Sequence, residues 1–147
     1  MRARFEPSHP AEASRIFVVE SDEVVRSALQ FILDDHDEVT AFASLEPALA
    51  GAESPAPNIV LLGIDLMRDE GERLLAGMAR RWPGAKVLVV ANSVNDRLAR
   101  ASLKWGAHEV IGKPITFDSV RGKVDALRAA PPISPALLAL LPLSAAW

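Results

Sequence analysis

The chain contains 147 residues, of which 50% are hydrophobic and 24% charged, a composition that suits one soluble globular domain. Its formal net charge of −3 gives no indication of nucleic-acid binding, and the absence of cysteine excludes disulfides and thiolate metal ligands. No apolar run approaches the roughly 20 residues that cross a bilayer, so we expect a cytoplasmic protein.

The first third of the chain predicts two strands, each followed by a helix. Residues 1–14 mix charged residues, prolines and small side chains without periodicity, and predict a flexible lead-in. Residues 15–19 read as a fully buried strand, and the apolar positions after them recur at helical spacing. Residues 38–42 alternate as an edge strand does, and residues 44–51 predict a short helix.

The remaining chain repeats this pattern three times. Pro83 stops one of the expected helices, Gly106 is a good C-terminal stop for the next, and Thr116 can cap the last. The expected strands lie at 59–62, 86–90 and 109–112. The first of the helices that follow them carries apolar residues between 74 and 82, the second runs over about 95–105, and the last follows Thr116.

Continuous apolar runs that alternate with amphipathic helices indicate a parallel sheet covered on both faces. We expect a single domain over residues 15–130. The tail, residues 131–147, contains no charged residue but several leucines. These leucines predict burial against the domain, a second subunit or a further domain, and the alternative is a linker with little order.

Ligands of open parallel sheets bind beyond the carboxyl ends of the strands, where the strand order reverses. We therefore compared the residues that follow the expected strands. They are Glu20-Ser21-Asp22, Gly63, Ala91 and Lys113-Pro114.

These strand ends resemble the receiver domain of bacterial two-component response regulators. Val18-Val19-Glu20-Ser21 matches the family's opening Val-Val-acidic-acidic motif, and Lys113-Pro114 matches its Lys-Pro. Counting back eight residues from Gly71, as the family's spacing requires, leads to Gly63. The resemblance covers about three quarters of the chain and implies a flavodoxin-like (βα)5 fold, a doubly wound five-stranded parallel sheet of order 2-1-3-4-5. It also implies a cis bond before Pro114.

The same resemblance shows what this sequence lacks. In the family an aspartate at the position of Gly63 accepts the phosphoryl group, and it binds Mg²⁺ together with the acidic pair. Here the second acid of the pair is Ser21, so Glu20 alone keeps a matched carboxylate. Ala91 replaces the hydroxyl residue that contacts the phosphoryl group, and Val110 replaces the aromatic switch. Glycine has no side-chain oxygen, so no acyl phosphate can form at Gly63.

Several residues of this degenerate pocket have alternative interpretations. Asp65 or Asp22 could rescue phosphorylation with Mg²⁺, but we expect Asp65 to be a solvated loop carboxylate and Asp22, or Ser21, to cap the first helix. We expect Lys113 to form an ion pair with Glu20, and an anion-sensing role is the alternative. Gly63 either lets the backbone close over an empty pocket or adopts a positive φ.

Basic residues lie along the fourth and fifth helices and predict either a solvated surface or a docking surface. The candidate interaction residues are Arg97, Arg100, Lys104, Trp105, Arg121 and Lys123, with Arg128 of the same sign. Receivers commonly pair or bind partners through the fourth helix, fifth strand and fifth helix.

We therefore predict a phosphorylation-independent pseudo-receiver that acts through protein contacts or self-association in bacterial signalling or transcription regulation. We expect no enzymatic activity, catalytic residue, metal or cofactor, and no direct binding of nucleic acid or membrane by this segment. The alternatives are an active receiver that uses Asp65 or Asp22 and a sensor in which Lys113 holds a small anion. The partner, the pathway and the presence of a downstream effector domain are not determined by these residues.

Overall fold

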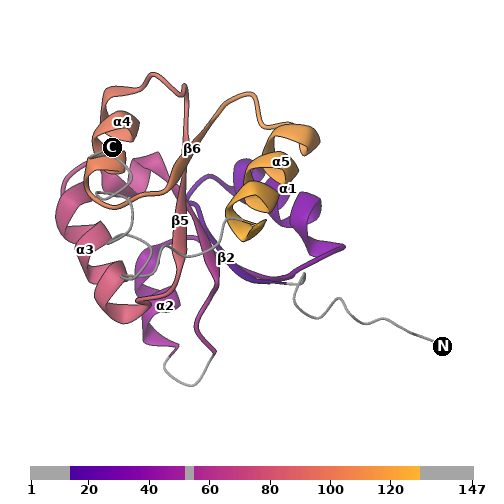
Figure 1. Ribbon diagram of the computed structural model, residues 1–147, viewed down its shortest axis with the longest axis horizontal. Helices are drawn as coiled ribbons and strands as arrows, with labels where there is room; N and C mark the ends of the chain where they lie inside the picture. Colours follow the sequence, from indigo (N-terminus) through magenta and orange to yellow (C-terminus); the bar gives the residue numbers. More distant parts are fainter. Residues whose placement is uncertain (1–13, 52–54, 130–147) are drawn as a thin grey trace, which may run out of the picture.

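The computed structural model describes residues 14–51 and 55–129, and five parallel strands form one sheet within them (Figure 1). The sheet order is β3-β2-β4-β5-β6, which is 2-1-3-4-5 in chain order and confirms the flavodoxin-like prediction. The expected lead-in, apart from Ser14, and the apolar tail lie outside the described residues. The strands are β2 (Arg15–Val19), β3 (Glu38–Phe42), β4 (Ile59–Gly63), β5 (Lys86–Ala91) and β6 (Glu109–Gly112).

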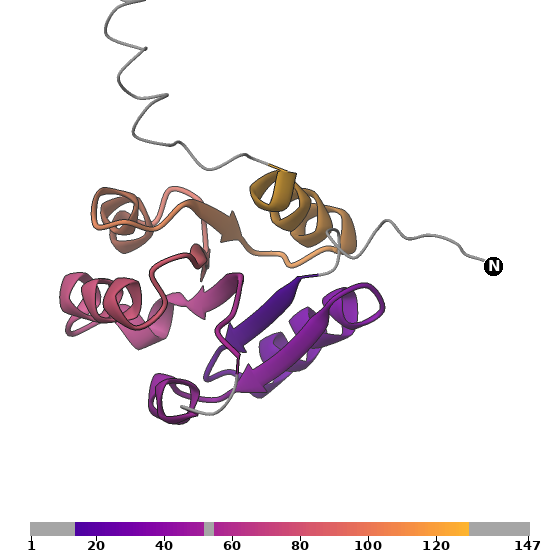
Figure 2. The ribbon, with the colours of Figure 1, turned by 60° about the horizontal axis from the view of Figure 1, so that its bottom comes forward.

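Helices cover both faces of the sheet, as Figures 1 and 2 show. One face carries α1 (Glu23–Asp34) and α5 (Phe117–Ala129). The other carries α2 (Leu45–Ala50), α3 (Gly71–Arg81) and α4 (Arg97–Lys104). A short 3₁₀ helix, η2 (Ile64–Met67), connects β4 to the loop before α3.

The alternation of side chains along each strand divides the core into two layers. On β2, Ile16 and Val18 pack with the α1 and α5 layer, whereas Phe17 and Val19 pack with the layer of α2, α3 and α4. The Phe17 ring meets the ring of Trp82 edge-on at 5.5 Å between centroids. Because both faces are covered, the central strands are apolar throughout, which explains the continuous runs in the sequence.

Side-chain caps begin the two helices α1 and α5. The Asp22 carboxylate accepts hydrogen bonds from the amides of Val24 (2.9 Å) and Val25 (3.0 Å), so Asp22 rather than Ser21 caps α1. Thr116 accepts from the Ser119 amide at 3.1 Å, as expected for the cap of α5. Within residues 14–51 and 55–129, no helix combines the length and apolar character needed to span a bilayer.

Candidate functional site

The carboxyl ends of the central strands bring the predicted pocket residues to one edge of the sheet. Glu20 directly follows β2, Gly63 ends β4 and Ala91 ends β5. The pairing of β2 with β4 and of β4 with β5 places these three positions on adjacent strands. Lys113 follows β6, and its amide donates to the Ala91 carbonyl at 3.1 Å. The folded chain thus assembles the pocket that the order of strands predicts.

The Glu20 carboxylate occupies the space where a side chain at position 63 would begin. A Cβ built on Gly63 would lie 2.8 Å from the Glu20 Cδ and would overlap its Oε1. Gly63 has φ −67° and ψ 137°, a conformation open to any residue, so of the two alternatives for this glycine the positive φ was wrong. Glycine therefore accommodates the close approach of the Glu20 carboxylate, and its backbone angles do not call for it.

Glu20 is a buried carboxylate held by the start of α1. The residue is 5% exposed, and its Oε2 accepts a hydrogen bond from the Asp22 amide at 2.9 Å. Burial raises the pKa of Glu20, although the Asp22 hydrogen bond and the positive charge of Lys113 act in the opposite direction. The nearby carboxylate of Asp65 adds to the increase in pKa.

The predicted ion pair between Glu20 and Lys113 is not formed. Among the salt bridges of the described residues, none joins these two side chains, and Lys113 is exposed. The reason is geometric, since the Glu20 carboxylate lies over Gly63 and the Lys113 ammonium stays in solvent. The lysine therefore acts on Glu20 only through its longer-range charge. The bond between Lys113 and Pro114 is cis, as the resemblance implied.

The two aspartates considered above as alternative phosphoacceptors both have other partners. Asp22 caps α1, and the amide hydrogen bond from Val25 is the main cause of its lowered pKa. Asp65 lies in η2, where it accepts two hydrogen bonds from Arg68, the shorter at 2.7 Å. Both aspartates are exposed, as is Ser21. Within the described part of the chain, no three acidic or histidine side chains cluster closely enough to hold a metal ion.

The positions of the predicted relay and switch are filled by core residues. Ala91 is fully buried and Val110 is 3% exposed, and both belong to the apolar cluster beneath α3 and α4. Neither side chain carries a hydrogen-bonding group, and valine has a single preferred rotamer in most settings. These two positions therefore have no polar or rotating group with which to sense an occupant of the pocket.

The predicted interaction residues divide into two groups. On α4, Arg97, Arg100 and Lys104 are exposed, while Trp105 at the end of the helix is half-buried. On α5, in contrast, the predicted residues make contacts inside the domain. Lys123 donates to the Val110 carbonyl at 2.9 Å.

Arg121 and its neighbour Arg128 bind a buried aspartate that the sequence analysis did not single out. Arg121 lies 3.3 Å and Arg128 2.7 Å from the carboxylate of Asp37, whose side chain is fully buried. The Asp37 carboxylate also accepts from the Ser14 amide at 2.9 Å. Burial raises the pKa of Asp37, but the hydrogen bonds from Arg128 and Ser14 outweigh this effect, and the pKa is lowered. The only sequence signal was an aspartate just before an edge strand, which is common in turns.

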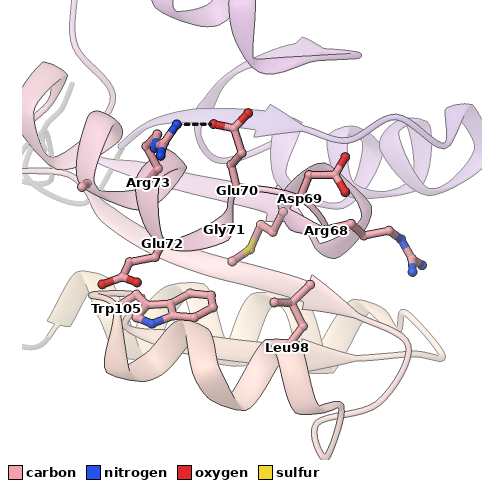
Figure 3. Close-up of a pocket in the computed structure, with 10 residues that line it drawn as sticks. Arg68, Asp69, Glu70, Gly71, Glu72, Arg73, Leu98 and Trp105 are labelled. Carbon is pink, nitrogen blue, oxygen red and sulfur yellow. Dashed lines mark hydrogen bonds and ion pairs between the residues drawn. The ribbon is translucent and has the colours of Figure 1, made fainter.

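A groove of about 590 Å³ lies between the start of α3 and one side of α4 (Figure 3). Leu98 of α4 and Trp105, which directly follows α4, line one side of it, and Met67 is also among its lining residues. Charged residues from Arg68 to Arg73 form the opposite rim, and Glu70 pairs with Arg73 at 3.4 Å. The Trp105 ring packs so closely that a Cβ on Gly71 would lie 2.8 Å from it.

Comparisons with known proteins agree on the fold and the family. The family model of the response regulator receiver domain matches residues 16–125. Among solved structures, the chain is similar to NtrX from Brucella abortus (27% identity, TM-score 0.71), a structure determined in complex with ADP. That match covers 79% of this chain but only 27% of NtrX.

Two other solved structures are matched over nearly their whole length. A CheY-like receiver domain protein from Methanospirillum hungatei is 27% identical with a TM-score of 0.68, over 79% of this chain and 94% of that one. A response regulator from Thermotoga maritima is 21% identical with a TM-score of 0.72, over 80% and 99% of the two chains. No curated protein sequence matches the chain.

Proposed function

Because the chain belongs to the response regulator receiver domain family, we propose that it is a pseudo-receiver, which regulates through protein contacts without being phosphorylated. The setting we propose is bacterial signalling or transcription regulation. In this role the domain catalyses no phosphoryl transfer to itself and needs no metal or cofactor.

The position of the Glu20 carboxylate is the observation that supports this proposal most directly. Phosphorylation of a receiver requires a carboxylate oxygen on β4 that attacks phosphorus, and Gly63 supplies no atom for this attack. Glu20 fills the vacated space with a buried negative charge. This charge would repel an incoming phosphoryl group. The pocket also lacks a second matched carboxylate to help bind Mg²⁺, an ion that prefers oxygen ligands in octahedral geometry.

The alternative acceptors are less suited to the reaction. Asp22 uses its carboxylate to cap α1, and Asp65 is paired with Arg68. Phosphorylation at either residue would cost the contact that holds the side chain in place. For this reason we favour a binding module over an active receiver.

The test is exposure of the full chain to acetyl phosphate and Mg²⁺, followed by intact-mass measurement under acidic conditions. We expect no mass increase of one phosphoryl group, and we expect NMR spectra that do not change when beryllofluoride and Mg²⁺ are titrated. A saturable gain of mass would refute the proposal. Asp22→Asn and Asp65→Asn variants would then identify the acceptor, since only the variant that lacks it would lose the modification.

A further inference from the structure

A second and smaller hollow lies at the carboxyl end of α3, next to the amino end of β5, and has a volume of about 130 Å³. We call it the α3 hollow. Its described lining is mostly apolar and includes Leu75, Met78, Trp82, Ala85, Val87 and Trp105. Apolar cavities of about 150 Å³ admit benzene, so the α3 hollow has room for one leucine side chain, which contains only four carbons.

Among its described lining residues, the α3 hollow presents no charge at neutral pH. Only His108 can titrate, and its Nδ1 accepts a hydrogen bond from the Val87 amide at 3.0 Å. Partial burial and the positive charge of Lys86 lower the pKa of His108, so the imidazole is neutral at pH 7. The larger groove between α3 and α4 differs, because its lining includes the charged residues Arg68, Asp69, Glu70, Glu72 and Arg73. An uncharged apolar segment therefore suits the α3 hollow better than the groove.

The last turn of α5 is held close to this hollow. The Lys86 ammonium donates a hydrogen bond to the Leu127 carbonyl at 2.7 Å. Lys86 begins β5, and its neighbours on either side, Ala85 and Val87, both line the α3 hollow. Successive strand residues point to opposite faces, so Lys86 reaches α5 on one face while Val87 lies on the face of α3 (Figure 1). The chain that follows Ala129 therefore starts at the amino end of β5, across the sheet from the hollow.

The tail that starts at this point has the matching composition and enough length. Residues 131–147 contain no charged side chain, and four leucines lie within residues 137–141. An extended chain spans about 3.3 Å per residue, so the eight residues from Ala129 to Leu137 reach up to about 26 Å. Packed layers lie about 10 Å apart, which puts the helix layers on the two faces of the sheet roughly 20 Å from each other. The leucines can therefore pass the end of the sheet and reach the α3 hollow.

We propose that the α3 hollow binds residues 137–141 of the same chain, with one leucine side chain seated beside Trp105. The tether makes this contact intramolecular, at an effective concentration of about a millimolar, which favours the chain's own tail over a separate partner of similar affinity. The tail then belongs to the receiver domain and is not a linker. This inference goes beyond the proposed function and does not depend on whether the domain is phosphorylated.

Paramagnetic broadening in NMR spectra of the full chain tests the proposal. The chain has no cysteine, so Ser144→Cys provides a single attachment point for a nitroxide label just beyond the leucines. We expect the label to broaden the amide signals of Ala85, Gly106 and His108, which line the α3 hollow, relative to the same sample after reduction of the nitroxide. The broadening should be much weaker at Arg68 and Asp69, which line the groove.

Two exposed alanines of α3 provide matched variants, because Ala79 lines the α3 hollow whereas Ala76 lines the groove. In the labelled chain, Ala79→Arg should abolish the broadening and Ala76→Arg should leave it unchanged. Replacement of the four leucines of residues 137–141 by glutamine should also abolish it, and this change leaves every described residue as it is.

A mixed sample separates the chain's own tail from the tail of a second copy. It combines isotope-labelled chain without the nitroxide and unlabelled chain that carries it, and we expect no broadening there. Broadening in the mixture, no broadening in the singly labelled chain, the strongest effect at Arg68 and Asp69, or broadening that survives Ala79→Arg would each overturn the proposal. The acetyl phosphate experiment is independent of these outcomes, so the pseudo-receiver proposal can fail or survive separately.

Discussion

Substitution of Gly63 by alanine tests whether the Glu20 carboxylate occupies the space next to residue 63, where a side chain would begin. The added Cβ would overlap Glu20 Oε1 and would lie 2.8 Å from its Cδ, so the carboxylate must turn away. Since the carboxylate is the end of a flexible side chain, the overlap is relieved by rotation. The rotation breaks the hydrogen bond from the Asp22 amide to Glu20. Its loss should cost roughly 1 kcal/mol, because water then hydrates the freed carboxylate.

A second effect of the substitution has the opposite sign. Alanine restricts the unfolded chain more than glycine does, and Gly63 has backbone angles that alanine adopts without strain. This effect stabilises a protein by about 0.4–1 kcal/mol. In the wild-type background the two effects nearly cancel, so we expect Gly63→Ala to lower the free energy of unfolding by about 0–1 kcal/mol. In a Glu20→Ala background only the favourable effect remains, and the same substitution should be stabilising.

The measurement is a double-mutant cycle from urea denaturation at pH 7, with an expected coupling energy of about 1 kcal/mol between positions 20 and 63. Gly77→Ala provides a control in α3, because its added Cβ would touch nothing closer than 4.0 Å. This control should stabilise the protein by about 0.5–1 kcal/mol in either background. Equal effects of Gly63→Ala with and without Glu20 would refute the idea that the carboxylate fills this space.

Three further predictions concern charged side chains. The pKa of Glu20 is higher in the folded protein than in the unfolded chain, so protonation of Glu20 stabilises the fold. This stability is fully present below the ordinary Glu pKa of about 4.3 and is lost as pH rises through the folded pKa. The denaturation midpoint of Glu20→Gln should not show this decline with pH, and parallel pH profiles of variant and wild type would contradict the prediction. Asp37→Asn should lower the free energy of unfolding by about 3–5 kcal/mol, because it leaves two largely buried arginines without their charged partner. Asp125 is a half-exposed partner of the same two arginines, so Asp125→Asn should lower it by less than about 1 kcal/mol in the same denaturation assay. Lys113→Ala should lower the denaturation midpoint only slightly, because the exposed ammonium acts on Glu20 through its longer-range charge alone, and a large loss of stability would show that an ion pair with Glu20 forms in solution.

Much of the fold followed from patterns that act locally. Apolar runs of four to six residues between helical stretches required a sheet covered on both faces, and the structure confirms it. The caps at Asp22 and Thr116 were predictable because a short polar side chain satisfies the free amides of a helix that begins next to it. The set of residues at the sheet edge was predictable for a related reason, since parallel strands end at the same edge.

Other features depended on side chains that are distant in sequence. The expected Glu20–Lys113 pair had suitable charges, but the Glu20 carboxylate turned toward the space over Gly63 instead. Asp37 became a buried centre only because α5 brings Arg121 and Arg128, more than 80 residues away, against it. Periodicity contains no information about such contacts, because it records which face of an element is apolar and not which polar group meets it.

The sequence by itself determined the order of elements, the edge where the pocket lies and the presence of a glycine at position 63, because these depend on residue type and spacing along the chain. Only the tertiary structure decided that the Glu20 carboxylate lies over Gly63 and that Arg121, Lys123 and Arg128 of α5 are used inside the domain. These features arise from the packing of separate elements, and a carboxylate or a phenyl ring takes its final position only when its neighbours in space are fixed.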